Sequence, residues 1–286
     1  MVELLLAVLD PGSSANLKPL FEQHLARIEQ QQGASSPKLG RAARDFGLFL
    51  LSLGDTEGAQ GRLRQSLAIE ETAETLEELA QLDPSQTVQL LERALAIRTK
   101  LKQPLGAAQI YSRLAAFYEV RRAPGVAADY YRSALALSEQ NLAPDDVRLA
   151  QAVADLAFCL EHQQKFKEAE PLYRRALAIQ ERKLGARHPE VAVTLNNLSG
   201  VLGATGRASL AEPLLRRSIS ILESTLGVNH PRVAAALGNL GDLLTATGRQ
   251  AGAQPLYRRA IAIYELVGDE ESKAHLLNGM RASPGR

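Results

Sequence analysis

The stretch Ala169-Glu170-Pro171-Leu172-Tyr173-Arg174-Arg175-Ala176-Leu177-Ala178-Ile179 occurs three times in this chain with small changes. The second copy is Ala211-Glu212-Pro213-Leu214-Leu215-Arg216-Arg217-Ser218-Ile219-Ser220-Ile221, and the third is Ala253-Gln254-Pro255-Leu256-Tyr257-Arg258-Arg259-Ala260-Ile261-Ala262-Ile263. The copies are evenly spaced, as the positions of their prolines show, and a weaker copy lies one period upstream around Asp129. Self-similarity at a fixed period of this kind is typical of a repeat protein.

The N-terminal part of the chain keeps this register less regularly. Pro19 and Gly61 are separated by the same full period, but the step from Gly61 to Gln89 is much shorter and the next step, to Asp129, is slightly shorter. The repeat at 71–104 has therefore lost about two helical turns. The chain is expected to begin inside the first helix of a repeat and to form a single array. Its expected segments are a truncated repeat at 1–36, degenerate repeats at 37–70 and 71–104, clear repeats at 105–146, 147–188, 189–230 and 231–272, and a cap or tail at 273–286.

Each repeat is predicted to contain two helices. In the first helix, leucines such as Leu195 and Leu202 fall on one stripe with helical periodicity. This helix is predicted to begin at Pro189, because a proline at the first helical position costs no hydrogen bond. The second helix is expected to run from the position of Ala169 and to stop at a glycine such as Gly185. The sequence therefore predicts an all-α chain of helix pairs, with about six full repeats and a truncated N-terminal one.

Two histidines stand just before the prolines that open first helices. His188 and His230 occupy a column in which other copies have Ser36 and Asp146, both good N-caps. A capping role explains these histidines, whereas a metal site would need further ligands that converge on them. Cys159 is the only cysteine and lies in an apolar run, which favours a packed thiol over a nucleophile. No metal and no cofactor are predicted.

Composition narrows the possible functions further. The formal net charge of +1 argues against general nucleic-acid binding. No apolar stretch approaches the roughly 20 residues needed to cross a bilayer, and no signal peptide is visible, so no membrane partner and a cytoplasmic location are expected. The spacing Gly200-x-x-Gly203-x-x-Gly206 superficially resembles a phosphate loop, but it lies in a helical pattern without a preceding strand or a Gly-Lys-Ser/Thr. The chain is therefore not expected to be an enzyme, and no catalytic residue is proposed.

A second motif links the end of each repeat to the start of the next. It reads Leu184-Gly185-Ala186-Arg187-His188-Pro189-Glu190-Val191-Ala192, followed by Leu195-Asn196-Asn197-Leu198, and recurs as Leu226-Gly227-Val228-Asn229-His230-Pro231-Arg232-Val233-Ala234. This motif resembles the tetratricopeptide family and, within it, the kinesin light chain-like variant with its longer repeat. The resemblance is strong over 147–272 and moderate over 105–146. It implies a right-handed superhelical solenoid of antiparallel helix pairs, whose inner groove, lined by first helices, binds extended or helical peptides.

The side chains of that groove can be located by rotating ~100° per residue along each first helix. The relevant face lies about a third of a turn from the leucine stripe. Applied to each repeat, this rule predicts the following peptide-binding residues: Gln109, Ser112, Glu119, Gln151, Phe158, Glu161, His162, Val193, Asn196, Gly200, Gly203, Asp242 and Thr245.

Small residues dominate the C-terminal part of this face. A glycine inside a helix costs roughly 1 kcal/mol relative to alanine, so Gly200, Gly203 and Gly238 require a reason. They either leave room for a bulky ligand side chain or allow tight helix packing. The family resemblance places Asn197 and its equivalent one repeat on against the adjacent helix, whereas Asn196 faces the groove. We expect one apolar or aromatic residue of a partner to be anchored near Gly200 and Gly203.

The paired arginines of the repeated stretch form a basic stripe on the second helices. This stripe is either a site for phosphate or an acidic partner, or a solvated outer face. Two functions follow for the whole chain. The first is a non-catalytic scaffold that binds a protein or peptide segment in the groove. The second is a structural or regulatory sensor module of a larger bacterial-type protein, which self-associates or has its groove occupied by its own chain.

Overall fold

A computed structural model describes residues 14–281, and this part of the chain contains fourteen helices and no strand. The truncated helix expected at the very start of the chain lies outside the described residues. Contacts divide the chain into two compact units, residues 1–110 and 111–286. The helices are α2 (Ser14–Gln32), α3 (Pro37–Ser52), α4 (Thr56–Ile69), α5 (Ala73–Leu82), α6 (Thr87–Lys100), α7 (Pro104–Val120), α8 (Pro124–Asn141), α9 (Val147–His162), α10 (Phe166–Leu184), α11 (Pro189–Ala204), α12 (Ala208–Leu226), α13 (Pro231–Ala246), α14 (Gln250–Val267) and α15 (Glu270–Arg281).

The first unit contains α2 to α6 and the beginning of α7. Its core lies between α2, α3 and α4, where Phe21 stacks on Phe46 and Phe49 with ring centroids 5.0 and 4.8 Å apart. Helix α5 pairs with α6 but is only 10 residues long, whereas α3 has 16 residues. Part of the contraction of the repeat at 71–104 is therefore a shorter first helix.

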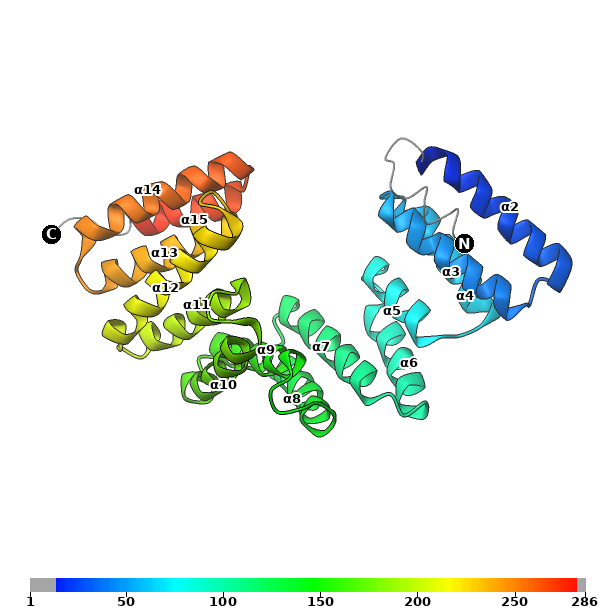
Figure 1. Ribbon diagram of the computed structural model, residues 1–286, viewed down its shortest axis with the longest axis horizontal. Helices are drawn as coiled ribbons and strands as arrows, with labels where there is room; N and C mark the ends of the chain where they lie inside the picture. Colours follow the sequence, from blue (N-terminus) through cyan, green and yellow to red (C-terminus); the bar gives the residue numbers. More distant parts are fainter. Residues whose placement is uncertain (1–13, 282–286) are drawn as a thin grey trace. The chain divides into compact units, whose positions relative to one another are not determined.

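The second unit repeats one packing pattern along the chain. Helix α9 pairs with α10, α11 with α12, and α13 with α14, and each helix also packs on the next in sequence (Figure 1). Leucine, alanine, isoleucine and valine fill most of the core, and Tyr173 and Tyr257 are its largest fully buried side chains. Helix α15 packs on α14, and its buried Leu276 lies directly over Gly238 of α13. The expected all-α array of antiparallel helix pairs is confirmed.

The first helices begin as their sequences predict. The side chain of each expected N-cap accepts a backbone N–H two residues ahead: Ser36, Asp146, His188 and His230. His188 Nδ1 accepts from the N–H of Glu190 at 3.2 Å, so this ring nitrogen carries no proton. Just after the C-terminal end of α11, Gly206 adopts a φ of 75°. This left-handed backbone conformation is one that glycine enters without strain, and it stops the helix from continuing.

The second helices begin earlier than expected. Helix α10 starts at Phe166 rather than at Ala169, and α12 starts at Ala208. The reason is the tight turn between paired helices, in which Gln164 takes a φ of 59° and the chain re-enters a helix almost at once. The repeated proline, Pro171 in this copy, therefore lies inside the helix.

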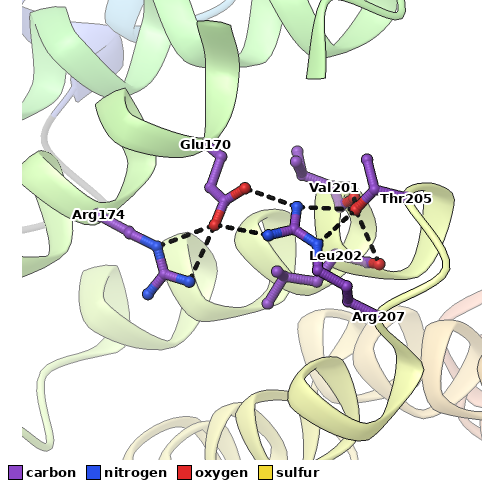
Figure 2. Close-up of polar contacts among 6 residues, drawn as sticks. All are labelled: Glu170, Arg174, Val201, Leu202, Thr205 and Arg207. Atoms are coloured by element: carbon purple, nitrogen blue, oxygen red, sulfur yellow. Dashed lines mark hydrogen bonds and ion pairs between the residues drawn. The ribbon is translucent and has the colours of Figure 1, made fainter. Parts of the chain in front are cut away.

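The basic stripe on the second helices is an ion-pair ladder. Glu170 accepts from Arg174 on its own helix at 3.0 Å and from Arg207, just before α12, at 2.6 Å (Figure 2). One repeat on, Glu212 binds Arg216 and Arg249 at 2.8 and 2.7 Å. The second arginine of each copy is also paired: Arg175 with Glu139, Arg217 with Glu181, and Arg259 with Glu223. Much of the stripe's positive charge is thus compensated within the chain, as on a solvated outer face.

We expect amide hydrogen exchange to be faster in α5 than in α11. Helix α5 has 10 residues against 16 in α11, so it buries less surface against its neighbours. The stability of a repeat array is approximately a sum of repeat and nearest-neighbour contributions, so a short helix weakens its own segment most. Mass-spectrometric hydrogen exchange on the full chain checks this. Equal or stronger protection of α5 would contradict the interpretation of 71–104 as a weak joint.

Candidate functional site

A pocket of about 470 Å³ lies across the first helices of three consecutive repeats of the second unit. Helices α9, α11 and α13 supply nearly all of its wall, and α12 contributes one side chain to its floor. Its lining residues are Phe158, Glu161, Asn196, Asn197, Ser199, Gly200, Gly203, Ala204, Leu215, Asn239, Asp242, Leu243 and Ala246. The volume lies within the range of small-ligand pockets and exceeds that of one large side chain.

The structure brings part of the predicted site together. The predicted residues that line the pocket are Phe158, Glu161, Asn196, Gly200, Gly203 and Asp242. Gln151, His162, Val193 and Thr245 lie on the same three helices but outside the lining, and Ser112 and Glu119 lie on α7. Gln109 belongs to the first unit. The pocket is thus narrower than the face predicted from helical rotation.

A tyrosine–carboxylate hydrogen bond recurs inside the repeats of the second unit. Tyr131 donates to Glu119 at 3.0 Å, and Tyr173, one period on, donates to Glu161 at 2.7 Å. In the last full repeat the Tyr257 hydroxyl donates to a carboxylate one turn earlier on the first helix, that of Asp242, at 2.7 Å. Each pair joins the second helix of a repeat to its first helix.

The repeat at 189–230 lacks this pair. Leu215 occupies the position of Tyr173, and Gly203 occupies the position of Glu161. Both substitutions remove volume at one place, and both residues line the pocket. The pocket therefore lies where the two preceding repeats have a phenol ring and a carboxylate.

Two carboxylates flank the pocket from opposite sides. Burial raises the pKa of Glu161, and the hydrogen bond from Tyr173 opposes this effect only in part. Burial, and next the hydrogen bond to Asp242, raise the pKa of Tyr257 to about 12. Within residues 14–281, neither Glu161 nor Asp242 is paired with a lysine or arginine. The neighbouring His162 supplies the compensating charge for Glu161 and acts to lower the pKa of this carboxylate.

Asparagines connect the helices along the rim of the pocket. Asn239 donates to Asn196 Oδ1 at 2.9 Å, and Asn196 donates to Asn197 Oδ1 at 3.3 Å. The expected contact of the Asn197 column with an adjacent helix therefore occurs at Asn239. Asn196, expected to face the groove, also belongs to this chain of amides.

The three glycines of the small-sided face have different surroundings. A Cβ on Gly238 would lie 2.7 Å from Leu276 of α15, so tight helix packing explains this glycine. A Cβ on Gly200 would meet Glu161 Oε1 at 2.8 Å, and one on Gly203 would meet Leu243 Cδ1 at 3.3 Å. Gly200 and Gly203 also line the pocket. Each of them therefore both contacts a neighbouring helix closely and leaves space on its pocket side.

Seven lining residues lie outside the predicted set: Asn197, Ser199, Ala204, Leu215, Asn239, Leu243 and Ala246. Leu215 is the one among them that does not lie on a first helix. The rule considered first helices only, whereas Leu215 lies on α12 and is buried at 2% exposure. A signal was nevertheless present in the sequence, because the aligned copies read tyrosine, leucine and tyrosine at this column. The same comparison places glycine at 203 where the preceding repeat has Glu161.

Nowhere in residues 14–281 do three or more His, Cys, Asp or Glu side chains gather so that they could hold a metal ion. Cys159 is buried, and this burial raises the pKa of its thiol to about 11, which disfavours the thiolate. Among the helices described, none combines the length and apolarity required to cross a bilayer.

Comparison with known proteins gives one family. The family model described as tetratricopeptide repeat matches residues 106–181, 148–224 and 201–265. None of the curated proteins matches the sequence.

Similar solved structures include several repeat proteins. BtubC (BKLC) from P. vanneervenii is 24% identical, with 87% of this chain and 92% of that chain covered and a TM-score of 0.63. A putative kinesin light chain from Podospora anserina with nearly identical TPR-like repeats is 20% identical, with 81% and 98% covered and a TM-score of 0.53. PilW, a type IV pilus biogenesis factor, is 16% identical, with 84% and 98% covered and a TM-score of 0.62. At these identities the likeness shows the fold.

Proposed function

The chain belongs to the tetratricopeptide repeat family, and from this premise we propose that it binds a segment of a partner protein in the pocket between α9, α11 and α13. Proteins of this family generally mediate protein–protein interactions and are generally non-catalytic scaffolds. The pocket lies on first helices, which line the peptide-binding groove of the family.

The missing tyrosine–carboxylate pair is the observation that carries this proposal. Both replacements are of a larger side chain by a smaller one at the same place, so they leave a hollow in the row of first helices that a side chain of a partner can fill. Gly203 and Leu215 form an apolar floor that can accept one large side chain of the partner. Peptide recognition concentrates affinity in a few such anchors.

The rim of the pocket suits the backbone of the bound segment. Asn196, Asn197 and Asn239 present amide donors and acceptors close to the opening. An extended segment has unpaired backbone N–H and C=O groups, which such side chains can satisfy. The proposed complex therefore has an apolar anchor at the floor and amide contacts at the rim.

Asn196→Ala is expected to weaken binding by roughly 1–2 kcal/mol, because a hydrogen bond at the rim is lost. Changing Arg216 and Arg217 to Glu is the matched control, since both lie in the outer ladder and should leave binding unchanged. The measurement is titration of each folded variant against the partner recovered by pull-down and mass spectrometry. Loss of binding in the arginine variant together with full binding by Asn196→Ala would show that the outer face is the site.

Sedimentation of the isolated chain tests the competing role as a self-associating module. A monomer at all concentrations supports the binding of a separate partner. Concentration-dependent mass that disappears when Gly203 is changed to Leu would instead place a second copy of the chain in the pocket.

A further inference from the structure

Two carboxylates that are not paired with a lysine or arginine in residues 14–281 are the property that distinguishes this pocket. Its only ionisable lining residues are Glu161 from α9 and Asp242 from α13, which lie on the two sides of α11. Tyr173 uses Oε2 of Glu161, and Tyr257 uses Oδ1 of Asp242. Each carboxylate thus keeps a second oxygen that these tyrosines do not engage.

The rest of the lining suits a long side chain with an apolar stem. Leu215 and Leu243 are buried beneath the opening, and Ala204 and Ala246 lie beside them. Phe158, at the α9 edge, is 39% exposed and packs edge-on against His162 with ring centroids 4.1 Å apart. An apolar floor, an aromatic edge and two carboxylates are the surroundings in which guanidinium groups are commonly bound.

We infer that the anchor of the partner segment is an arginine, whose guanidinium pairs with a carboxylate of the pocket lining, Glu161 or Asp242, and whose methylenes pack on the apolar floor at Leu215 and Leu243. The inference rests on the proposed function and specifies its ligand. Charge complementarity selects this occupant, because covering two carboxylates with a neutral side chain would remove their hydration without replacing it. An acidic segment would in addition meet direct repulsion.

The geometry favours arginine over lysine. The planar guanidinium has five N–H donors in a fixed fork, so it can pair with a carboxylate through two hydrogen bonds and also stack on an aromatic ring. The ammonium group of lysine is a compact, strongly hydrated charge.

The test uses the full chain and peptides of defined sequence. Random 12-residue peptides displayed on phage are selected on the wild-type protein, and enriched sequences are synthesised and titrated by fluorescence anisotropy. We expect an arginine at one fixed position. Replacing it by citrulline, which keeps the shape and removes the charge, should weaken binding by about 10- to 100-fold, and lysine should bind more weakly than arginine.

A double variant of the protein provides the matched comparison. Glu161→Gln with Asp242→Asn keeps side-chain oxygens that can accept from Tyr173 and Tyr257, so the fold should persist by circular dichroism. On this variant the difference between the arginine and citrulline peptides should disappear. An undiminished difference would overturn the assignment of the two carboxylates.

The outcomes separate the two proposals. Enriched peptides that lack arginine, or that bind equally well with citrulline or lysine, but fail to bind Gly203→Leu, would overturn the arginine anchor and leave the proposed pocket standing. Peptides that bind Gly203→Leu as tightly as the wild type would overturn the pocket itself. Failure to enrich any sequence on the folded protein would overturn both.

Discussion

Restoring the missing pair with Leu215→Tyr and Gly203→Glu is expected to abolish binding, with a loss of affinity of more than about 100-fold. The new phenol and carboxylate would occupy the space that Tyr173 and Glu161 occupy one repeat earlier, where their oxygens are 2.7 Å apart. The partner's anchor would then have no cavity to enter. Binding is measured with the recovered partner and with the selected peptides.

The double variant should fold as well as the native chain. The two preceding repeats already hold such a pair. The position opposite the ring, Ser199 in this repeat, is small, as its equivalents Ala157 and Gly241 are. Residues that agree with the other copies of a repeat usually stabilise it. Thermal unfolding followed by circular dichroism therefore separates lost binding from lost structure.

The single variants are the controls. Leu215→Tyr alone places a hydroxyl without a carboxylate acceptor, and Gly203→Glu alone places a carboxylate without a donor. Each should be less stable than the double variant, because the coupling between the two groups appears only when both are present. Native-like affinity in the well-folded double variant would show that the partner binds elsewhere.

Most of the fold could be predicted from the repeat period. The evenly spaced copies predicted helix pairs, and the His-Pro motif predicted where first helices begin, as the capping by His188 and His230 shows. These features are local, so they can be read from the sequence. The early start of α10 at Phe166 could not be read in this way, because it depends on the conformation of the turn at Gln164.

The pocket was predictable only in part. Helical rotation selects residues on one face, and it selected Phe158, Glu161 and Asp242, which line the pocket. It could not indicate that α15 covers Gly238 through Leu276. That contact depends on where the last helix packs. The binding role of the lining residues stays a prediction.

Asp155→Asn is expected to raise the free energy of unfolding at pH 7 by about 2–3 kcal/mol. Burial raises the pKa of Asp155 to about 6, with the charge of Glu119 adding to the effect and the hydrogen bond from Gln151, at 2.6 Å, opposing it. In the unfolded chain an aspartate titrates at about pH 3.9. The folded protein therefore holds this proton more tightly, and its charged form is the destabilising one.

The sign of the effect predicts its pH dependence. The contribution of Asp155 to stability is fully present below about pH 4, where the group is protonated in both states, and is lost as the pH rises through about 6. Asparagine does not ionise, so the gain from Asp155→Asn should be large at pH 7 and close to zero at about pH 4. Urea unfolding at both pH values, with hydrogen exchange in α9, measures it.

Asp146→Asn supplies a control of opposite sign. Hydrogen bonds from the Arg148 side chain and backbone lower the pKa of Asp146, a partly exposed N-cap that asparagine replaces well. Asp146→Asn should change the free energy of unfolding only slightly, and it should not raise it as Asp155→Asn does. If the gain in stability from Asp155→Asn persisted undiminished at pH 4, its cause would be packing rather than the charge of Asp155.

The next two repeats have asparagine, Asn197 and Asn239, in the column of Asp155. A gain in stability that depends on charge would therefore show that the repeat at 147–188 retains a buried carboxylate at the expense of its own stability.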